Sequence, residues 1–472
     1  MLFQTPEFVA LFLATLLTFY TIGQRFRLVV LAIASTLFYA ASGLADLTVF
    51  IATILVSYAI STRLKQDGPR WPLYAAVCLM LGSLAYYKYG GFFFDNLDPV
   101  WGLDKLISRD TAISTILPLG ISFYTFQIVA YFNDVHRGTT RPASSFLQYF
   151  VFVSFFAQLI AGPIMRGSRY LPQLAILRSA SREEFGNGAL LVLSGLVKKV
   201  IIADTLATTV DRLFVSDSFT QPEAMVAAGL FAFQIYFDFS GYVDIARGLA
   251  KMLGIKLDEN FRTPYVSGSF GEFWQRWHIT LSQWFRDYVY IPLGGNRVGR
   301  TREVGNLLLV MAIAGLWHGA GWQFVLWGAI HGVMLVIQRF VPSVYIQFIL
   351  PSSDKARERT YRVISVAVVF TLITLAWIPF RAGSLEESKL MYQAIFSFTE
   401  AGSWIDYWQE LSVFGMLFAA QYLERFVRES SEHRSRIERW IPSEVRGVSY
   451  GVVIVAIIGF SAGPQNFIYF RF

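Results

Sequence analysis

The recurrence of long apolar runs constrains the fold of this chain more than any other feature. Runs long enough to cross about 30 Å of hydrocarbon begin near Phe8 and recur to the last residues, separated by short polar loops. Hydrophobic residues make up 54% of the 472 residues and charged residues only 15%, unlike the usual composition of a soluble domain. The sequence therefore predicts an all-α integral membrane protein with roughly eleven to thirteen transmembrane and re-entrant helices in a single polytopic domain, residues 1–472.

Basic residues set the predicted orientation. The first run, 8–22, is followed by Arg25 and Arg27, which reverses the charge order of a secretory signal, so we expect it to be retained as a first span. The loop after the second run contains only Asp46 as a charge, whereas the third run is followed by Arg63, Lys65 and Arg70. The positive-inside rule then places the N-terminus outside. We assign the net charge of +7 to this orientation rather than to nucleic-acid binding.

Several chemistries lack the residues that they need. The chain has no HExxH, no GxxxxGK[ST], no Cys/His metal cluster and no lipase-type GxSxG, so metal-dependent and nucleotide hydrolysis are disfavoured and no metal site is expected. The only cysteine, Cys78, rules out an intrachain disulfide. Because Cys78 lies in an apolar run, we expect it to be a buried packing residue.

A histidine lies within an aromatic stretch, 273–297. Helical spacing places Trp274, Trp277, Leu281, Trp284, Phe285 and Tyr288 on one arc, opposite Glu272, Arg276, Arg286 and Asp287. This pattern predicts an amphipathic, interfacial helix with His278 at the edge of the aromatic arc, where it could be aimed into a cavity. A hydrogen-bonded structural histidine is an equally good interpretation of His278 alone.

A second histidine, His318, is the stronger catalytic candidate. It follows the apolar run 306–315 without a nearby charge, and an ionisable residue within a membrane segment is usually functional. A neutral imidazole can accept a proton from a hydroxyl, so His318 is predicted to be a general base for acyl transfer rather than a structural residue. On one continuous helix His331 would lie about 20 Å from His318. A break at Gly319 and Gly321 would change this distance, but packing or an interfacial hydrogen bond is the expected role of His331.

Acidic residues also occur in an apolar context. The segment 233–250 contains Asp238, Asp244 and Arg247, and the last two are spaced as i and i+3 on a helix. An internal ion pair lining a cavity is a better interpretation than a catalytic pair of carboxylates.

Several motifs in this order resemble the membrane-bound O-acyltransferase superfamily, and specifically its bacterial alginate O-acetylase-like branch. The resemblance covers nearly the whole chain. Besides the aromatic stretch and GLWHG at 315–319, the motifs are LPLGISFYTFQ (117–127), DVHRG (134–138), LIAGPIMR (159–166), KKVIIADTLA (198–207) and YFDFSGYVDIARGLA (236–250). It implies a ring of membrane helices around a central funnel, with His318 as the essential histidine and His278 as the second histidine of the family.

The resemblance also implies an activity and its partners. A member of this branch takes an acyl group, typically acetyl, from a cytoplasmic thioester and passes it outward for O-acetylation of an envelope polysaccharide such as alginate. The donor is acetyl-CoA or an acyl carrier protein, which acts as substrate, and no tightly bound cofactor is expected. The expected partners are the bilayer of the bacterial inner membrane, the polysaccharide acceptor and an extracytoplasmic acetyltransferase of the SGNH class, similar to AlgJ or AlgX.

The last six residues, FIYFRF at 467–472, have two interpretations. Phe467, Tyr469, Phe470 and Phe472 suit an aromatic anchor at the membrane interface. They also resemble the end of related envelope acylation proteins, in which a terminal aromatic motif with a central tyrosine has been proposed as an acyl relay. This resemblance makes Tyr469 a candidate covalent carrier activated by His318.

Two other classes of function stay open on the sequence alone. A transporter could use membrane histidines as proton relays, although the inverted repeats expected of a transporter are not visible. A non-catalytic scaffold could position a separate acylase, and in that case replacement of His318 would leave acylation intact.

Overall fold

The computed structural model describes residues 1–105, 109, 117–215, 218–340, 355–397, 402–429, 443–460 and 468. Every regular element within these ranges is a helix, as predicted. Two compact units form: the first comprises Met1–Leu196 and Tyr242–Asp258, and the second comprises Val197–Gly241 and Glu259–Phe472. The long helix α12 (Gln221–Met252) contributes to both units.

The first unit begins with α1, whose start and buried face are both explained by its sequence. Thr5 caps the helix by accepting a hydrogen bond from the Phe8 amide, and Pro6 occupies the first helical position. Phe8, Phe12 and Phe19 form the buried face, as helical spacing requires. The helices of this unit before α12 are α1 (Pro6–Thr21), α2 (Arg27–Ala40), α3 (Leu44–Ser61), α4 (Arg70–Leu84), α5 (Gly90–Trp101), α7 (Ile121–His136), α8 (Phe146–Ser154), α9 (Gly167–Ala175) and α10 (Arg182–Leu196).

The prediction for Cys78 is wrong, because its side chain is exposed on α4. The buried face of α4 consists of Leu73, Ala76, Met80 and Leu84, at intervals of three to four residues. Cys78 falls on the opposite face of the helix. An apolar run in a membrane protein has a lipid-facing side as well as a packed side, so hydropathy alone could not place this residue.

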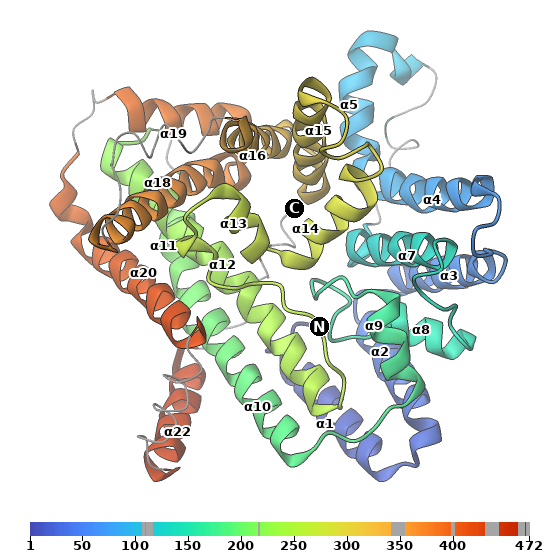
Figure 1. Cartoon of the computed structure of the whole chain (residues 1–472). Coiled ribbons are helices and arrows are strands. Elements are labelled where there is room, and N and C mark those ends of the chain that lie inside the picture. Colours follow the sequence, from blue (N-terminus) through green and yellow to red (C-terminus); the bar gives the residue numbers. More distant parts are fainter. Residues whose placement is uncertain are drawn as a thin grey trace. The chain divides into compact units, whose positions relative to one another are not determined.

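The second unit contains the remaining helices, which are drawn from green to red in Figure 1. They are α11 (Asp204–Phe214), α13 (Phe270–Arg276), α14 (Ile279–Phe285), α15 (Arg300–His318), α16 (Trp322–Phe340), α18 (Lys355–Arg381), α19 (Leu385–Ser397), α20 (Trp408–Glu429) and α22 (Ser443–Phe460). Two π-helical segments also belong to this unit, η4 (Val197–Ala203) and η6 (Arg286–Tyr290), and η2 (Ala85–Tyr89) is a third in the first unit. Such segments are rare and are frequently found at functional sites.

Membrane character follows from the long apolar helices. Within the described ranges, four helical segments are long and apolar enough to cross a bilayer: Leu44–Ser61, Gln221–Met252, Trp322–Phe340 and Thr360–Arg381. Outward-facing apolar side chains such as Leu17 and Ile458, about 70% exposed, suit contact with lipid. The protein is therefore an all-α membrane protein. The helix count of eleven to thirteen, the ring around a funnel, the single domain and the outside N-terminus stay predictions.

Candidate active site

The helices α15 and α16 form a tight hairpin that carries His318 at its tip, and they run side by side in the upper part of Figure 1. Two glycines allow the backbones to approach this closely. A Cβ atom on Gly315 would lie 2.1 Å from the carbonyl oxygen of Phe324, and one on Gly328 would lie 2.1 Å from that of Met311. At Gly319, just after His318, a Cβ atom would collide with the Phe324 ring. The glycines in the sequence around His318 therefore close the hairpin and fix the place of the imidazole.

His318 is only 3% exposed and is surrounded by aromatic rings. Its ring centroid lies 4.9 Å from that of Trp317, 5.0 Å from Trp327 and 5.1 Å from Phe380, and each of these rings meets the imidazole edge to face. Edge-to-face contacts with three rings restrict rotation of the imidazole. The contacts come from α15, α16 and α18, so three helices together hold the orientation of His318.

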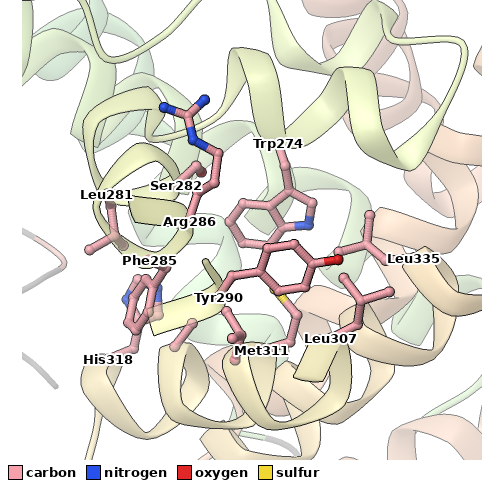
Figure 2. Close-up of a pocket in the computed structure, with 12 residues that line it drawn as sticks. Trp274, Leu281, Ser282, Phe285, Arg286, Tyr290, Leu307, Met311, His318 and Leu335 are labelled. Carbon is pink, nitrogen blue, oxygen red and sulfur yellow. The ribbon is translucent and has the colours of Figure 1, made fainter. Parts of the chain in front are cut away.

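An apolar cavity of about 180 Å³ lies beside His318. Figure 2 shows His318 at one end of the lining side chains and Leu307 and Leu335 at the other. Leu307 precedes His318 by eleven residues on α15, so the cavity extends along about 16 Å of the helix. The remaining lining residues come from α13, α14, η6 and α15: Trp274, Leu281, Ser282, Phe285, Arg286, Tyr290, Val310, Met311 and Ala314. A cavity with this lining can hold a small apolar group against the imidazole.

A larger and more polar cavity of about 520 Å³ adjoins the first one. The two share Arg286, Tyr290, Leu307 and Leu335 as lining residues. The larger cavity adds Ile291, Asn296, Glu303, Gln338 and Arg339. Its charged side chains lie at the end of the hairpin away from His318. Together the two cavities run from a charged mouth to a buried histidine.

One ion pair and one tyrosine define the electrostatics of this mouth. Arg339 pairs with the buried carboxylate of Glu303 at 3.0 Å, but 53% of the Arg339 side chain stays exposed. Partial burial raises the pKa of the Tyr290 phenol, and the nearby Glu303 carboxylate raises it further. Tyr290 is therefore a neutral hydrogen-bond donor between the two cavities.

His278 has a different setting from the one predicted. Its backbone is left-handed, with φ of 40°, and this conformation divides the expected single helix into α13 and α14. The predicted continuous amphipathic helix is therefore wrong, although Trp277, Leu281, Trp284 and Phe285 are buried as their arc required. The side chain is fully buried, with ring centroids 4.9 Å from Phe239 and 6.0 Å from Trp317. His278 is not among the residues that line the two cavities described above.

Asn260 holds the chain where it breaks at His278. This fully buried side chain accepts hydrogen bonds at Oδ1 from the Thr280 amide, at 3.0 Å, and from the Thr280 hydroxyl, at 2.7 Å. Its backbone carbonyl accepts from the Ile279 amide at 3.0 Å. Asn260 thus satisfies the first amides of α14, which lie immediately after His278. Sequence reasoning missed it, because a lone asparagine eighteen residues upstream gives no local signal.

The hairpin also changes the interpretation of His331. Since α15 ends at His318 and α16 begins at Trp322, the two histidines do not share a helix and the distance of about 20 Å does not apply. The ring of Trp327 instead lies between them, 5.0 Å from His318 and 4.6 Å from His331. His331 is fully buried against Trp274 and Phe273 as well, in agreement with the packing role that was expected.

The remaining site predictions have different outcomes. Asp244 and Arg247 do form an ion pair, with 3.5 Å between Oδ1 and Nη1. Asp238 pairs with Lys199 instead, at 2.8 Å, a partner that the sequence reasoning did not name. Tyr469 lies outside the described residues. Within the described ranges, no group of three His, Cys, Asp or Glu side chains is arranged to hold a metal ion.

Comparison with known proteins gives the family. A model of the membrane-bound O-acyltransferase family matches residues 140–380, which include His278, His318 and most residues that line the cavities. The chain belongs to this family. It is therefore a membrane-bound O-acyltransferase, and its relatives place it in the alginate O-acetylase-like branch.

Three of the similar proteins differ in the polymer that their names give. The chain is 38% identical over 414 residues to the Probable alginate O-acetylase AlgI of Pseudomonas aeruginosa, covering 86% of this chain and 76% of the relative. It is 35% identical to the Peptidoglycan O-acetyltransferase of Helicobacter pylori, covering 82% and 78%. It is 27% identical to the Teichoic acid D-alanyltransferase of Streptococcus thermophilus, covering 70% and 79%. Each name states the transfer of a small acyl group: the first two name acetyl transfer with alginate or peptidoglycan, and the third names D-alanyl transfer with teichoic acid.

Proposed function

We propose that this protein takes an acetyl group from a cytoplasmic thioester and passes it across the inner membrane for O-acetylation of an envelope or extracellular polysaccharide. The observation that carries this proposal is the position of His318 at one end of an apolar cavity whose other end adjoins a charged mouth. Alginate and peptidoglycan, named for two relatives, are the acceptor classes that we favour.

The two cavities suit a donor with one charged end and one small reactive end. A thioester donor such as acetyl-CoA or an acyl carrier protein is bulky and anionic, so it stays outside the hydrocarbon region. Arg286 and Arg339 at the polar cavity provide positive charge for the anionic part. The slender acyl-bearing arm can then reach along α15 toward His318. Only the acyl group has to pass beyond that point.

His318 is the proposed general base. Its imidazole takes the proton of an acceptor hydroxyl while the hydroxyl oxygen attacks the thioester carbonyl. The bond from carbon to oxygen forms, the bond from carbon to sulfur breaks, and the proton passes from the imidazole to the departing thiolate. The products are an oxygen ester and a free thiol. His278 supports this step through Trp317, whose ring contacts both imidazoles.

The acceptor of the first transfer is proposed to be the hydroxyl of Tyr469. An ester formed there would pass the acyl group to an SGNH-type extracytoplasmic acetyltransferase, similar to AlgJ or AlgX, which would hand it to the polysaccharide. The aromatic anchor stays as the alternative role of Tyr469. A Tyr469→Phe variant separates the two roles, because it keeps the aromatic ring and removes only the nucleophile.

The test uses protein purified into nanodiscs and supplied with an acetyl thioester, with release of the free thiol as the readout. We expect His318→Ala to lower the rate by about 100-fold or more, the usual loss when a general base is removed. His136→Ala is the matched control, since His136 ends α7 in the first unit and should react at the wild-type rate. Wild-type thiol release by His318→Ala would overturn the catalytic role and favour a scaffold.

A further inference from the structure

A buried cluster of charges in the second unit has no part in the reaction described above. The Lys199 ammonium, on the π-helical segment η4, lies 2.7 Å from Asp204 Oδ1 and 2.8 Å from Asp238 Oδ1. The side chains of Lys199 and Asp238 are only 7% and 4% exposed. None of the three lines either cavity of the candidate active site. A charged cluster inside a membrane protein is expensive, and such residues usually serve a function.

The cluster has one positive and two negative side chains, so its carboxylates need further hydrogen-bond donors. Asp238 finds one outside the cluster. Its Oδ2 atom accepts a hydrogen bond of 2.7 Å from the backbone amide of Ile468, a residue that is 2% exposed. A hydrogen bond from an amide to a buried carboxylate is short and strong because the acceptor is charged.

The position of Asp238 gives the depth of this contact. Asp238 lies seventeen residues from the start of α12 and fourteen from its end, which is about 26 Å and about 21 Å along the axis. Ile468 therefore meets a membrane-type helix near its middle. Aromatic anchors lie at the membrane interfaces, near the ends of a membrane-spanning helix. A contact near the middle of α12 does not fit that position.

A second observation brings the same part of the chain to η4. The helix α22, which ends at Phe460, packs against η4, the segment that carries Lys199. Both α22 and Ile468 thus contact the elements that build the charged cluster: α22 lies against η4, and Ile468 bonds to α12 through its backbone amide.

We infer that Asp238, paired with Lys199, forms a binding site for the backbone amide of Ile468 and holds this residue in the interior of the second unit. Lys199 and Asp238 are positioning residues, because they act through the segment that they hold. The inference rests on the proposed function in one respect: Tyr469 follows Ile468, and consecutive Cα atoms are about 3.8 Å apart. The cluster would therefore fix the starting point of the proposed acyl carrier.

The placement is tested by alkylation of a cysteine at position 468, which keeps the backbone amide. The full chain carries Ile468→Cys in a Cys78→Ser background, because Cys78 is exposed and would react. We expect Asp238→Ala to raise the maleimide labelling rate about tenfold or more, since a hydrogen bond to a charged group is lost. Asp204→Ala is the matched control. Either variant leaves Lys199 with one carboxylate, but only Asp238 bonds Ile468, so Asp204→Ala should label at the parent rate.

A second pair of variants tests the amide itself. Ile468→Pro removes the N–H donor, whereas Ile468→Ala shortens the side chain and keeps the donor. We expect Ile468→Pro to lower thiol release in the nanodisc assay and Ile468→Ala to retain it, with both proteins unfolding at similar temperatures. Rapid labelling of the parent, or equal labelling of the Asp238→Ala and Asp204→Ala variants, would overturn the inference. Labelling does not depend on catalysis, so its result stands whether or not His318→Ala supports the proposed function.

Discussion

The α15–α16 hairpin and the α13–α14 segment each bring a histidine to Trp317, but they do so by opposite means. The hairpin holds His318 at the end of a continuous helix, through direct contact between two backbones at Gly315 and Gly328. The α13–α14 segment holds His278 at a break in the helix, through hydrogen bonds to the single side chain of Asn260. The position of His318 therefore depends on glycines that leave room for two backbones to touch. The position of His278 depends on the hydrogen bonds of one asparagine side chain.

The two surroundings also differ in access. His318 lines a cavity, whereas His278 is fully buried among rings and lines neither cavity. A general base must reach the proton that it removes. This difference favours His318 for the proposed proton transfer and His278 for a supporting position, although both histidines are buried among aromatic rings.

The largest effect is expected from adding one methyl group to the hairpin. Gly328→Ala would place Cβ 2.1 Å from the Met311 carbonyl oxygen, so the helices must separate. We expect a loss of about 3 kcal/mol in the free energy of unfolding, at the upper end for overpacking, and loss of thiol release because His318 moves. Thermal unfolding in nanodiscs measures the first effect.

Gly82→Ala is the control for this change. Gly82 lies in α4, where a Cβ atom would meet nothing within 4 Å, so the same substitution should be neutral or slightly stabilising. An unchanged unfolding temperature for Gly328→Ala would show that backbone contact does not hold the hairpin.

The sequence leaves the hairpin open, because a break at Gly319 and Gly321 is only an alternative to one continuous helix through His318 and His331. The structure shows the break, since α15 ends at His318 and α16 begins at Trp322. For the α13–α14 segment the sequence predicts a single helix, which is wrong. Its aromatic spacing fits one helix, but the left-handed backbone at His278 depends on Asn260, which is remote in sequence. Local periodicity carries no information about such a partner. For the same reason the pairing of Lys199 with Asp238 could not be anticipated.

A smaller effect is expected from removing the polar support of the second histidine. Asn260→Ala deprives the Thr280 amide and hydroxyl of their acceptor and should cost about 2 kcal/mol of stability. If Asn260 acts through His278, Asn260→Ala should lower thiol release about tenfold in the wild-type background and have no further effect in His278→Ala.

Asn306→Ala is the matched control for Asn260→Ala. Asn306 is also a buried asparagine, and it donates to the carbonyl groups of Leu293 and Gly295 in the loop before α15. Its effect on thiol release should persist in the His278→Ala background. Equal effects of Asn260→Ala with and without His278 would contradict the positioning role and leave Asn260 a purely structural residue.

The smallest effect is expected at the mouth, where the two regions meet. Arg286 follows α14 and pairs with Asp287 at 2.7 Å, whereas Arg339 lies in the last turn of α16 and pairs with Glu303 at 3.0 Å. If both arginines attract an anionic donor, each change to Gln should raise KM for acetyl-CoA a few-fold at low salt and leave kcat unchanged. An uncharged short-chain acetyl thioester should show no change in KM.

Glu303→Gln is the control with the opposite expected effect. It removes the carboxylate that pairs with Arg339, so it should lower KM for acetyl-CoA. Parallel shifts for charged and uncharged donors would mean that these side chains shape the mouth rather than attract the donor, and the hairpin and the α13–α14 segment would then contribute geometry alone.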